Sequence, residues 1–213
     1  MTEDSTNEDP TRQARHTMVR EQLIKRGIQA CSVLNALERV PRHRFVPAAE
    51  RSAAYSDHPL PIGAGQTISQ PYVVAYMLEQ AAIQPPDRVL EIGTGCGYQT
   101  ALLAELAAAV YSVEVVPELA EKAGKVLAEL NVDNVQIRVG DGSCGWPEEA
   151  PFDVIIGSAA PPEIPPALLE QLALQGRLVM PVGRAHQQIV LVRRTDSGLE
   201  RRTLLPVRFV PMV

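Results

Sequence analysis

The chain has 213 residues, of which 46% are hydrophobic, enough for one domain with a substantial core. Its 20 basic and 25 acidic residues leave a net charge of −5, which argues against a nucleic-acid partner because such proteins usually present a basic face. No run of about 18 or more apolar residues is present, so we expect no membrane span.

The first ten residues and the cysteines indicate a reducing compartment. Residues 1–10 are acidic and polar, without the basic and then apolar order of a secretory signal, and we expect them to be a disordered tail. The cysteines, Cys31, Cys96 and Cys144, are odd in number and lack a zinc spacing, so reduced thiols are the simple interpretation. We therefore expect a cytoplasmic monomer without a metal site, with a single domain over residues 11–213.

The N-terminal part of the chain predicts three helices around an irregular segment. The helices cover residues 11–26, 32–39 and 71–82. The first ends at Gly27, a typical stop, and the third opens with Pro71 at a position where proline is tolerated. The segment between the second and third helices holds four prolines together with Gly63 and Gly65, so it is irregular, with room for short strands.

From Arg88 onward, apolar runs alternate with helical stretches. Seven runs are predicted strands, over residues 88–92, 110–114, 135–139, 153–157, 177–182, 187–193 and 203–209. Strands that alternate with helices imply a mainly parallel sheet with right-handed crossovers. Residues 195–198 are too short for a helix, so the last two strands should form an antiparallel pair. The prediction is a three-layer α/β domain, in which residues 11–85 precede a core over residues 86–213.

Residues 89–97, Val-Leu-Glu-Ile-Gly-Thr-Gly-Cys-Gly, place three glycines between a strand and an Ala/Leu-rich helix. Such a turn lets a ligand approach the backbone closely. A dinucleotide loop needs a glycine where this chain has Tyr98, and a phosphate loop ending in Gly-Lys-Ser/Thr is absent from the sequence. From Glu91 to Gly97 the loop instead resembles the Glu-x-Gly-x-Gly-x-Gly pattern of S-adenosylmethionine sites. A tight turn without a ligand is the alternative.

Two acidic residues follow the next two predicted strands and strengthen the cofactor interpretation. Glu114 lies about 20 residues after the loop, where doubly wound folds place an acid on ribose hydroxyls. Asp141 ends the following strand and is placed to accept a hydrogen bond from an adenine amino group. This cofactor carries an ammonium and a sulfonium but no phosphate, so nearby carboxylates are favourable. Taken singly, either acid also fits a solvated turn.

Strings outside the loop resemble protein-L-isoaspartate (D-aspartate) O-methyltransferases from about residue 14 to the end. They lie at residues 40–47, 54–55, 60–63, 65–71, 140–142, 145–147, 150–153 and 181–183, and Gln-Thr-Ile-Ser-Gln-Pro at 66–71 is the most family-specific. The resemblance implies the Rossmann-like fold of class I S-adenosylmethionine-dependent methyltransferases, with residues 11–85 as the helical and substrate-side segment. It also implies methyl transfer to the free α-carboxylate of L-isoaspartyl and D-aspartyl residues in damaged proteins, which starts repair through a methyl ester and a succinimide.

The resemblance also assigns roles to residues. Ser69 matches the active-site serine of the family. The implied cofactor contacts are Gln66, Thr67, Ile68, Ser69, Glu91, Gly93, Thr94, Gly95, Glu114, Val115, Asp141 and Gly142. The acceptor carboxylate is already ionised at neutral pH, so no general base is needed and Ser69 should orient the substrate rather than attack it. An N-cap of the helix that begins at Pro71 is the alternative role of Ser69.

Other functions and residues compete with this prediction. A carboxyl methyltransferase acting on aspartate in one dedicated peptide, or a non-catalytic cofactor-binding partner protein, are the alternatives. A methyltransferase acting on base amines is disfavoured, because residues 158–162, Ser-Ala-Ala-Pro-Pro, lack the Asn/Asp-Pro-Pro-aromatic motif. We expect structural roles for His43, His58, Tyr72 and Trp146, and no nucleophilic role for Cys96.

Overall fold

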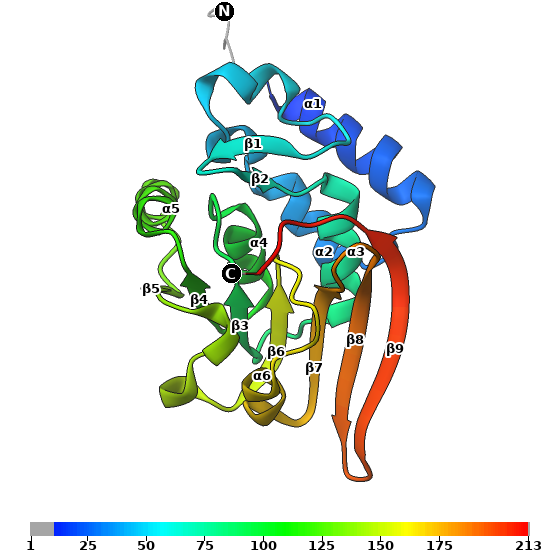
Figure 1. The fold of residues 1–213 in the computed structure, drawn as a ribbon. Coiled ribbons are helices and arrows are strands. Elements are labelled where there is room, and N and C mark those ends of the chain that lie inside the picture. The colour runs from blue at the N-terminus through cyan, green and yellow to red at the C-terminus, as the bar shows by residue number, and fades with distance from the viewer. Residues whose placement is uncertain (1–10, 213) are drawn as a thin grey trace, which may run out of the picture.

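The computed structural model describes residues 11–212, so the predicted tail over residues 1–10 lies outside the described residues (Figure 1). The first predicted helix is confirmed as one helical run made of α1 (Arg12–Thr17), a π-helical segment (Met18–Leu23) and a 3₁₀ turn (Ile24–Arg26). It ends at Gly27, where φ is 94°, a left-handed conformation that glycine adopts easily.

The other predicted elements of the N-terminal part are also confirmed. The second and third helices are α2 (Cys31–Arg39) and α3 (Pro71–Ala81). Between them lie two 3₁₀ segments (Arg42–Phe45 and Ala48–Ala53) and an antiparallel hairpin of β1 (Leu60–Gly63) and β2 (Gln66–Ile68). This irregular stretch therefore carries the family-specific string on β2 and on the turn that leads into α3.

Seven strands form the central sheet, as the sequence predicts. They are β3 (Arg88–Ile92), β4 (Ala109–Glu114), β5 (Val135–Val139), β6 (Phe152–Gly157), β7 (Leu172–Val182), β8 (Gln187–Thr195) and β9 (Gly198–Val207). Their order across the sheet is β5-β4-β3-β6-β7-β8-β9 (Figure 1). The first five pair in parallel, and β8 and β9 add two antiparallel pairings, which confirms the predicted antiparallel end.

Two strands, β7 and β9, begin five residues earlier than predicted, and the other five lie within two residues of their predicted bounds. β7 begins at residue 172 rather than 177. Gln175 adopts a left-handed φ of 63°, which interrupts the alternation of side chains between the two faces of the sheet, so the first residues of β7 lack the sequence pattern of a strand. β9 covers residues 198–207 rather than 203–209. Its first half is an exposed edge with polar side chains, so it carries no apolar pattern.

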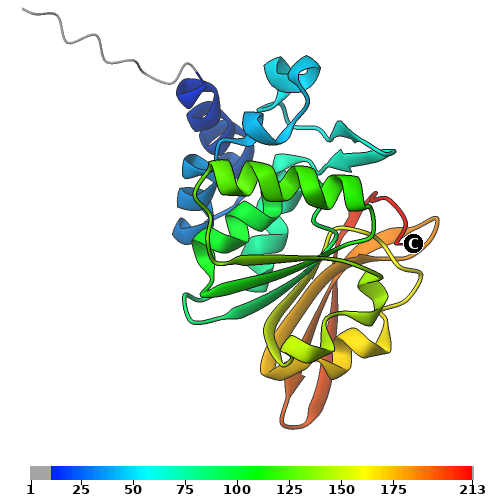
Figure 2. The ribbon, with the colours of Figure 1, turned by 90° about the vertical axis from the view of Figure 1, so that its left-hand side faces the viewer.

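Helices cover both faces of the sheet in unequal amounts. α4 (Tyr98–Leu106) and α5 (Pro117–Glu129) lie with the N-terminal helices on one face, and the short α6 (Pro166–Glu170) lies on the other (Figure 2). Successive side chains of β3 point to opposite faces of the sheet, so the strand packs against the helices on both faces. Val89 belongs to the hydrophobic cluster that contains Leu102 of α4, whereas Leu90 belongs to the cluster that contains Leu168 of α6.

The chain reverses its direction across the sheet beside β3. From β3 it proceeds to β4 and β5 on one side, and then crosses to β6 on the other side of β3. Ligands of open α/β sheets bind at such a switch point, outside the carboxyl ends of the strands. The glycine loop leaves the carboxyl end of β3, which places it at this point. Within residues 11–212, no helix is long and apolar enough to cross a membrane.

Replacement of Gly97, at the start of α4, should destabilise the fold. It precedes α4 with φ of 88°, and a Cβ there would lie 3.1 Å from Cβ of Ala123 on α5. We expect Gly97→Ala to lower the free energy of unfolding by about 1–2 kcal/mol, because of left-handed strain and close packing. Urea denaturation would measure the loss.

Gly124 gives a matched control on the facing helix. It lies in α5, and a Cβ there meets nothing within 4 Å. Gly124→Ala should therefore raise stability by up to about 1 kcal/mol, as expected for alanine in an open helical position. Equal stabilities for Gly97→Ala and the wild type would show that the loop adapts without cost.

Candidate functional site

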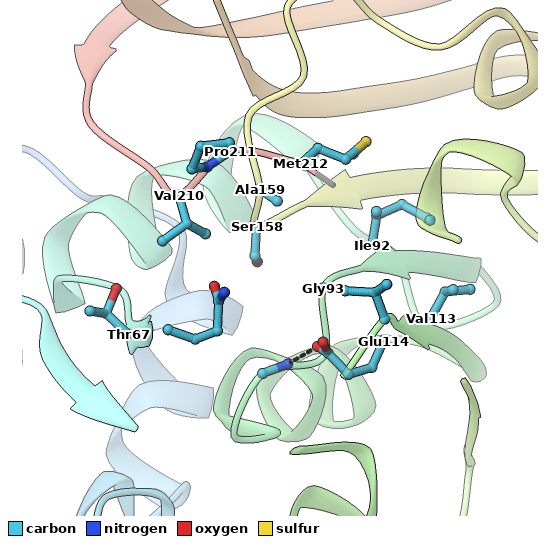
Figure 3. A pocket seen from close by; sticks show the side chains of 14 residues that line it. Thr67, Ile92, Gly93, Val113, Glu114, Ser158, Ala159, Val210, Pro211 and Met212 are labelled. Atoms are coloured by element: carbon cyan, nitrogen blue, oxygen red, sulfur yellow. Dashed lines mark hydrogen bonds between the residues drawn. The ribbon is translucent and has the colours of Figure 1, made fainter. Parts of the chain in front are cut away.

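A cavity opens at the carboxyl ends of β3, β4 and β6 (Figure 3). Seven of the residues predicted to contact the cofactor line this first cavity, namely Gln66, Thr67, Gly93, Gly95, Glu114, Val115 and Gly142. They come from the β1–β2 hairpin, the glycine loop and the ends of β4 and β5. The structure therefore brings together segments that are far apart in the sequence.

Glu114 connects the glycine loop to the end of β4. Its Oε2 accepts a hydrogen bond of 2.7 Å from the backbone N–H of Gly95, drawn dashed in Figure 3. Its Oε1 accepts one of 3.0 Å from the backbone N–H of Val116. Each carboxylate oxygen has a second lone pair, so Glu114 can still accept hydrogen bonds from ligand hydroxyls in the cavity that it lines.

Glu91 lies behind the loop rather than against the first cavity. Its side chain is fully buried, and the alternation of β3 directs it toward α4. Oε2 accepts hydrogen bonds from Thr100 Oγ1 (2.6 Å) and Ser112 Oγ (2.7 Å), and Oε1 accepts one from Gln99 Nε2 (3.2 Å). Burial raises the pKa of Glu91 to about 7, and the three hydrogen bonds oppose that rise.

Three further predicted contacts do not line the first cavity. Thr94 is buried, and its hydroxyl is 2.6 Å from Ser112 Oγ. Ile68 is buried on β2. Asp141 is exposed and accepts a hydrogen bond of 2.8 Å from the backbone N–H of Ser143, and its hydrogen bonds with Ser143 hold its pKa below the ordinary value. Its neighbour Gly142 lines the cavity.

Two more cavities adjoin the first. The second is larger and is lined by Ser69, Gln70, Tyr72 and Val73 at the start of α3, by Arg26, and by the segment from Leu205 to Val210. The third is small and lies between Ser69 and the residues from Gly93 to Gln99. Thr67 and Ser158 line all three cavities. The three cavities therefore lie side by side, with Thr67 and Ser158 between them.

Ser69 lines the second and third cavities. The alternative prediction, that its side chain caps α3, is wrong. The N-cap of α3 is Gln70, without a side-chain capping bond, so Ser69 does not cap the helix. Its backbone carbonyl instead accepts a hydrogen bond of 2.8 Å from Arg42 Nη2. Helix capping therefore does not account for the serine side chain at this position.

Sequence reasoning missed the part that Arg42 plays. The side chain is 0% exposed, and its Nε also donates to the carbonyl of Ala54 at 2.8 Å. Burial lowers the pKa of the guanidinium. Arg42 thus joins the 3₁₀ segments to the turn that carries Ser69. The Arg-His-Arg string at residues 42–44 does not indicate which arginine is buried, because only contacts made in the folded protein determine that.

The sequence also did not show that the C-terminal segment borders the first cavity. The N–H of Ala160 donates to the carbonyl of Val210 at 2.9 Å, and the N–H of Met212 donates to the carbonyl of Ala160 at 3.0 Å. These bonds hold Val210, Pro211 and Met212 over the cavity, beside Ala159 (Figure 3). A pairing across about fifty residues leaves no local pattern.

The other candidates have structural partners. Burial raises the pKa of Cys96 to about 11, which keeps the thiol neutral and fits the expectation that it is no nucleophile. His43 Nδ1 is 2.8 Å from Tyr55 Oη, and the Trp146 ring packs edge-on against Tyr111. Among the described residues, no group of three or more His, Cys, Asp or Glu side chains is arranged to hold a metal ion.

Curated relatives are similar to this chain over nearly the full length of both proteins. One from Picosynechococcus sp., named protein-L-isoaspartate O-methyltransferase, is 52% identical over 204 residues, which cover 96% of this chain and 92% of the relative. Another of the same name, from Gloeobacter violaceus, is 54% identical over 197 residues, which cover 92% of this chain and 96% of the relative. The similarity therefore extends over the whole domain, not the cofactor loop alone.

Solved structures agree with the sequence relatives. One named protein-L-isoaspartate O-methyltransferase superposes with a TM-score of 0.85 at 30% identity, over 92% of this chain and 65% of its own. A Plasmodium falciparum beta-aspartate methyltransferase in complex with S-adenosyl-L-homocysteine has a TM-score of 0.81 at 25% identity, over 93% of this chain and 98% of its own. The family model described as Protein-L-isoaspartate(D-aspartate) O-methyltransferase matches residues 13–213. With the predicted fold confirmed, the chain belongs to the protein-L-isoaspartate (D-aspartate) O-methyltransferase family.

Proposed function

We propose that this chain transfers the methyl group of S-adenosylmethionine to the free α-carboxylate of L-isoaspartyl and D-aspartyl residues in damaged proteins. The observation that carries the proposal is the junction of the cavities at Thr67 and Ser158. A donor in the first cavity and an acceptor in the second would meet there. The resulting ester is a better electrophile than a carboxylate, so the following backbone nitrogen closes a succinimide, and hydrolysis returns some normal aspartate.

The reaction asks for positioning more than for acid–base catalysis. The acceptor carboxylate is ionised at neutral pH, and the sulfonium is a good leaving group. Catalysis then consists of holding the carboxylate oxygen, the methyl carbon and the sulfur in line. The neutral thiol of Cys96 and the hydroxyls of Ser69 and Ser158 suit that task, because none of them competes as an ionised nucleophile.

We assign the ligand contacts as follows. Glu114 accepts hydrogen bonds from the ribose hydroxyls, and Asp141 accepts one from the adenine amino group. The glycine loop approaches the methionine part of the cofactor, with Glu91 supporting the loop from behind. The second cavity receives the isoaspartyl peptide, and Ser69 orients its carboxylate.

The proposal extends to the assembly and location of the protein. We propose that the protein has no nucleic-acid partner, because its net charge is −5, and that it is cytoplasmic, because the cysteines at positions 31, 96 and 144 are all free thiols. We also propose that it is a monomer. Light scattering of the purified protein would test the monomer.

A transfer assay with two matched peptides tests the proposed function. The peptides differ only in carrying isoaspartate or aspartate, and the cofactor carries a labelled methyl group. We expect a base-labile methyl ester on the isoaspartyl peptide alone. Equal label on both peptides, or label on neither, would contradict the assignment, and a base-stable label would point to methylation at nitrogen.

Ser69→Ala separates substrate orientation from cofactor binding. We expect kcat to fall about tenfold, because the acceptor carboxylate loses a hydrogen bond that fixes its position. The dissociation constant for S-adenosyl-L-homocysteine should stay within about twofold. Ser197→Ala, in the β8–β9 hairpin, is the control and should match the wild type. A larger loss of cofactor affinity than of turnover would show that Ser69 serves the first cavity instead.

A further inference from the structure

Ser158 occupies the position between the two proposed ligands. It follows β6 directly, and its backbone N–H donates to the carbonyl of Ile92 at 2.8 Å, which fixes it beside the end of β3. Its side chain points into the space bordered by Thr67 and Gly93 (Figure 3). Whereas Ser69 lines the second and third cavities, Ser158 lines all three.

The hydroxyl of Ser158 is held as an acceptor from its buried side. Gln99 Nε2 donates a hydrogen bond of 2.9 Å to Ser158 Oγ. A hydroxyl that accepts one bond retains its own proton for another, so the O–H of Ser158 is available to a group in the cavities. An anionic ligand is the natural acceptor for that proton.

The orientation of Gln99 is itself determined by its surroundings. The residue is 8% exposed, and its Nε2 also donates to Glu91 Oε1 at 3.2 Å. Both amide hydrogens are thereby used, one on Glu91 and one on Ser158. The nitrogen that donates to Glu91 Oε1 is the one that donates to Ser158 Oγ, so the contact with Glu91 keeps the amide nitrogen, rather than the amide oxygen, facing Ser158.

We propose that Ser158 is a second substrate-binding residue of the transfer site, which donates its hydroxyl proton in a hydrogen bond to the isoaspartyl carboxylate, with Gln99 as the positioning residue that keeps this proton available. The inference rests on the proposed function. One carboxylate oxygen accepts the bond from Ser158, while the other attacks the methyl carbon. An O–C bond forms, the S–C bond breaks with its electron pair moving to sulfur, and no proton is transferred.

Ser158→Ala is the direct test, because it removes the hydroxyl and keeps the Cβ of the side chain. We expect kcat/KM for the isoaspartyl peptide to fall about tenfold, with the dissociation constant for S-adenosyl-L-homocysteine within about twofold of the wild type. Ser197→Ala should behave as the wild type.

A loss of threefold or more at unchanged cofactor affinity supports the inference, and a smaller loss, or an equal loss of cofactor affinity, overturns it. Should Ser158→Ala fail to fold, Ser158→Cys retains the volume with a weaker donor, and the same thresholds apply. A wild-type enzyme that leaves the isoaspartyl peptide unmethylated would instead remove the proposed function itself.

A double-mutant cycle tests the role of Gln99. Gln99→Met removes the amide donor and should lower kcat/KM by threefold or more in the wild-type background. If Gln99 acts through Ser158, the same change should have no further effect on kcat/KM in Ser158→Ala. Losses that multiply in the double variant would show that Gln99 contributes only to the general structure, and would overturn its assigned role.

Discussion

Glu114→Ala is expected to weaken the binding of S-adenosyl-L-homocysteine about 100-fold. Glu114 is 5% exposed and lines the first cavity, where its carboxylate would accept two hydrogen bonds from the ribose. Hydrogen bonds to a charged group contribute roughly 1.5–3 kcal/mol each, and about 3 kcal/mol in total corresponds to about 100-fold in affinity. The variant also loses the bond that holds the Gly95 N–H.

Calorimetric titration measures this loss, and an exposed acid on the following helix provides the control. Glu118 lies in the first turn of α5 and pairs with Lys122 at 2.7 Å. Glu118→Ala should bind the ligand within about twofold of the wild type. If Glu114→Ala binds within threefold of the wild type, Glu114 has no ribose contact and the cavity holds its ligand differently.

The second large effect concerns how stability depends on pH, through Glu91. Burial raises the pKa of Glu91 from 4.5 to about 7, so between these values the folded state holds the proton more tightly than the unfolded state. The wild type should therefore lose stability as pH rises through this window, by about 3 kcal/mol in all, and lose no more above it. Glu91→Gln lacks the titrating group and should lack this term.

Urea denaturation at pH 5, 6, 7 and 8 tests the prediction. The unfolding free energy of the wild type should fall relative to that of Glu91→Gln by about 2–3 kcal/mol over this range. Glutamine keeps the shape of the side chain, and the hydroxyls of Thr100 and Ser112 can rotate to accept from its amide. Parallel pH profiles for the two proteins would show that Glu91 keeps an ordinary pKa.

Local patterns were sufficient for most of the fold. The strands next to the glycine loop are short, apolar and separated by helical periods, so their number and order along the chain were readable. The errors lie where tertiary structure overrides such patterns. The left-handed conformation of Gln175 interrupts the strand pattern, so the start of β7 was not predicted. The first five residues of β9 were missed because they are exposed and carry no apolar pattern.

The candidate site was readable to the extent that it lies on contiguous motifs. The loop and the acids that end β4 and β5 lie together because parallel strands end at one edge of the sheet. The loop motif did not reveal that alternation directs Glu91 into the core beneath α4. Arg42, Ser158 and Val210 reach the site through contacts that cross the fold, so no spacing in the sequence marks them.

A crystal structure with S-adenosyl-L-homocysteine tests most directly the central claim that donor and acceptor cavities meet at Thr67 and Ser158. We predict the ligand in the first cavity, with its ribose within hydrogen-bonding distance of Glu114 and its sulfur facing the opening between Thr67 and Ser158. A ligand seated in the second cavity, or a sulfur turned away from that opening, would contradict the account.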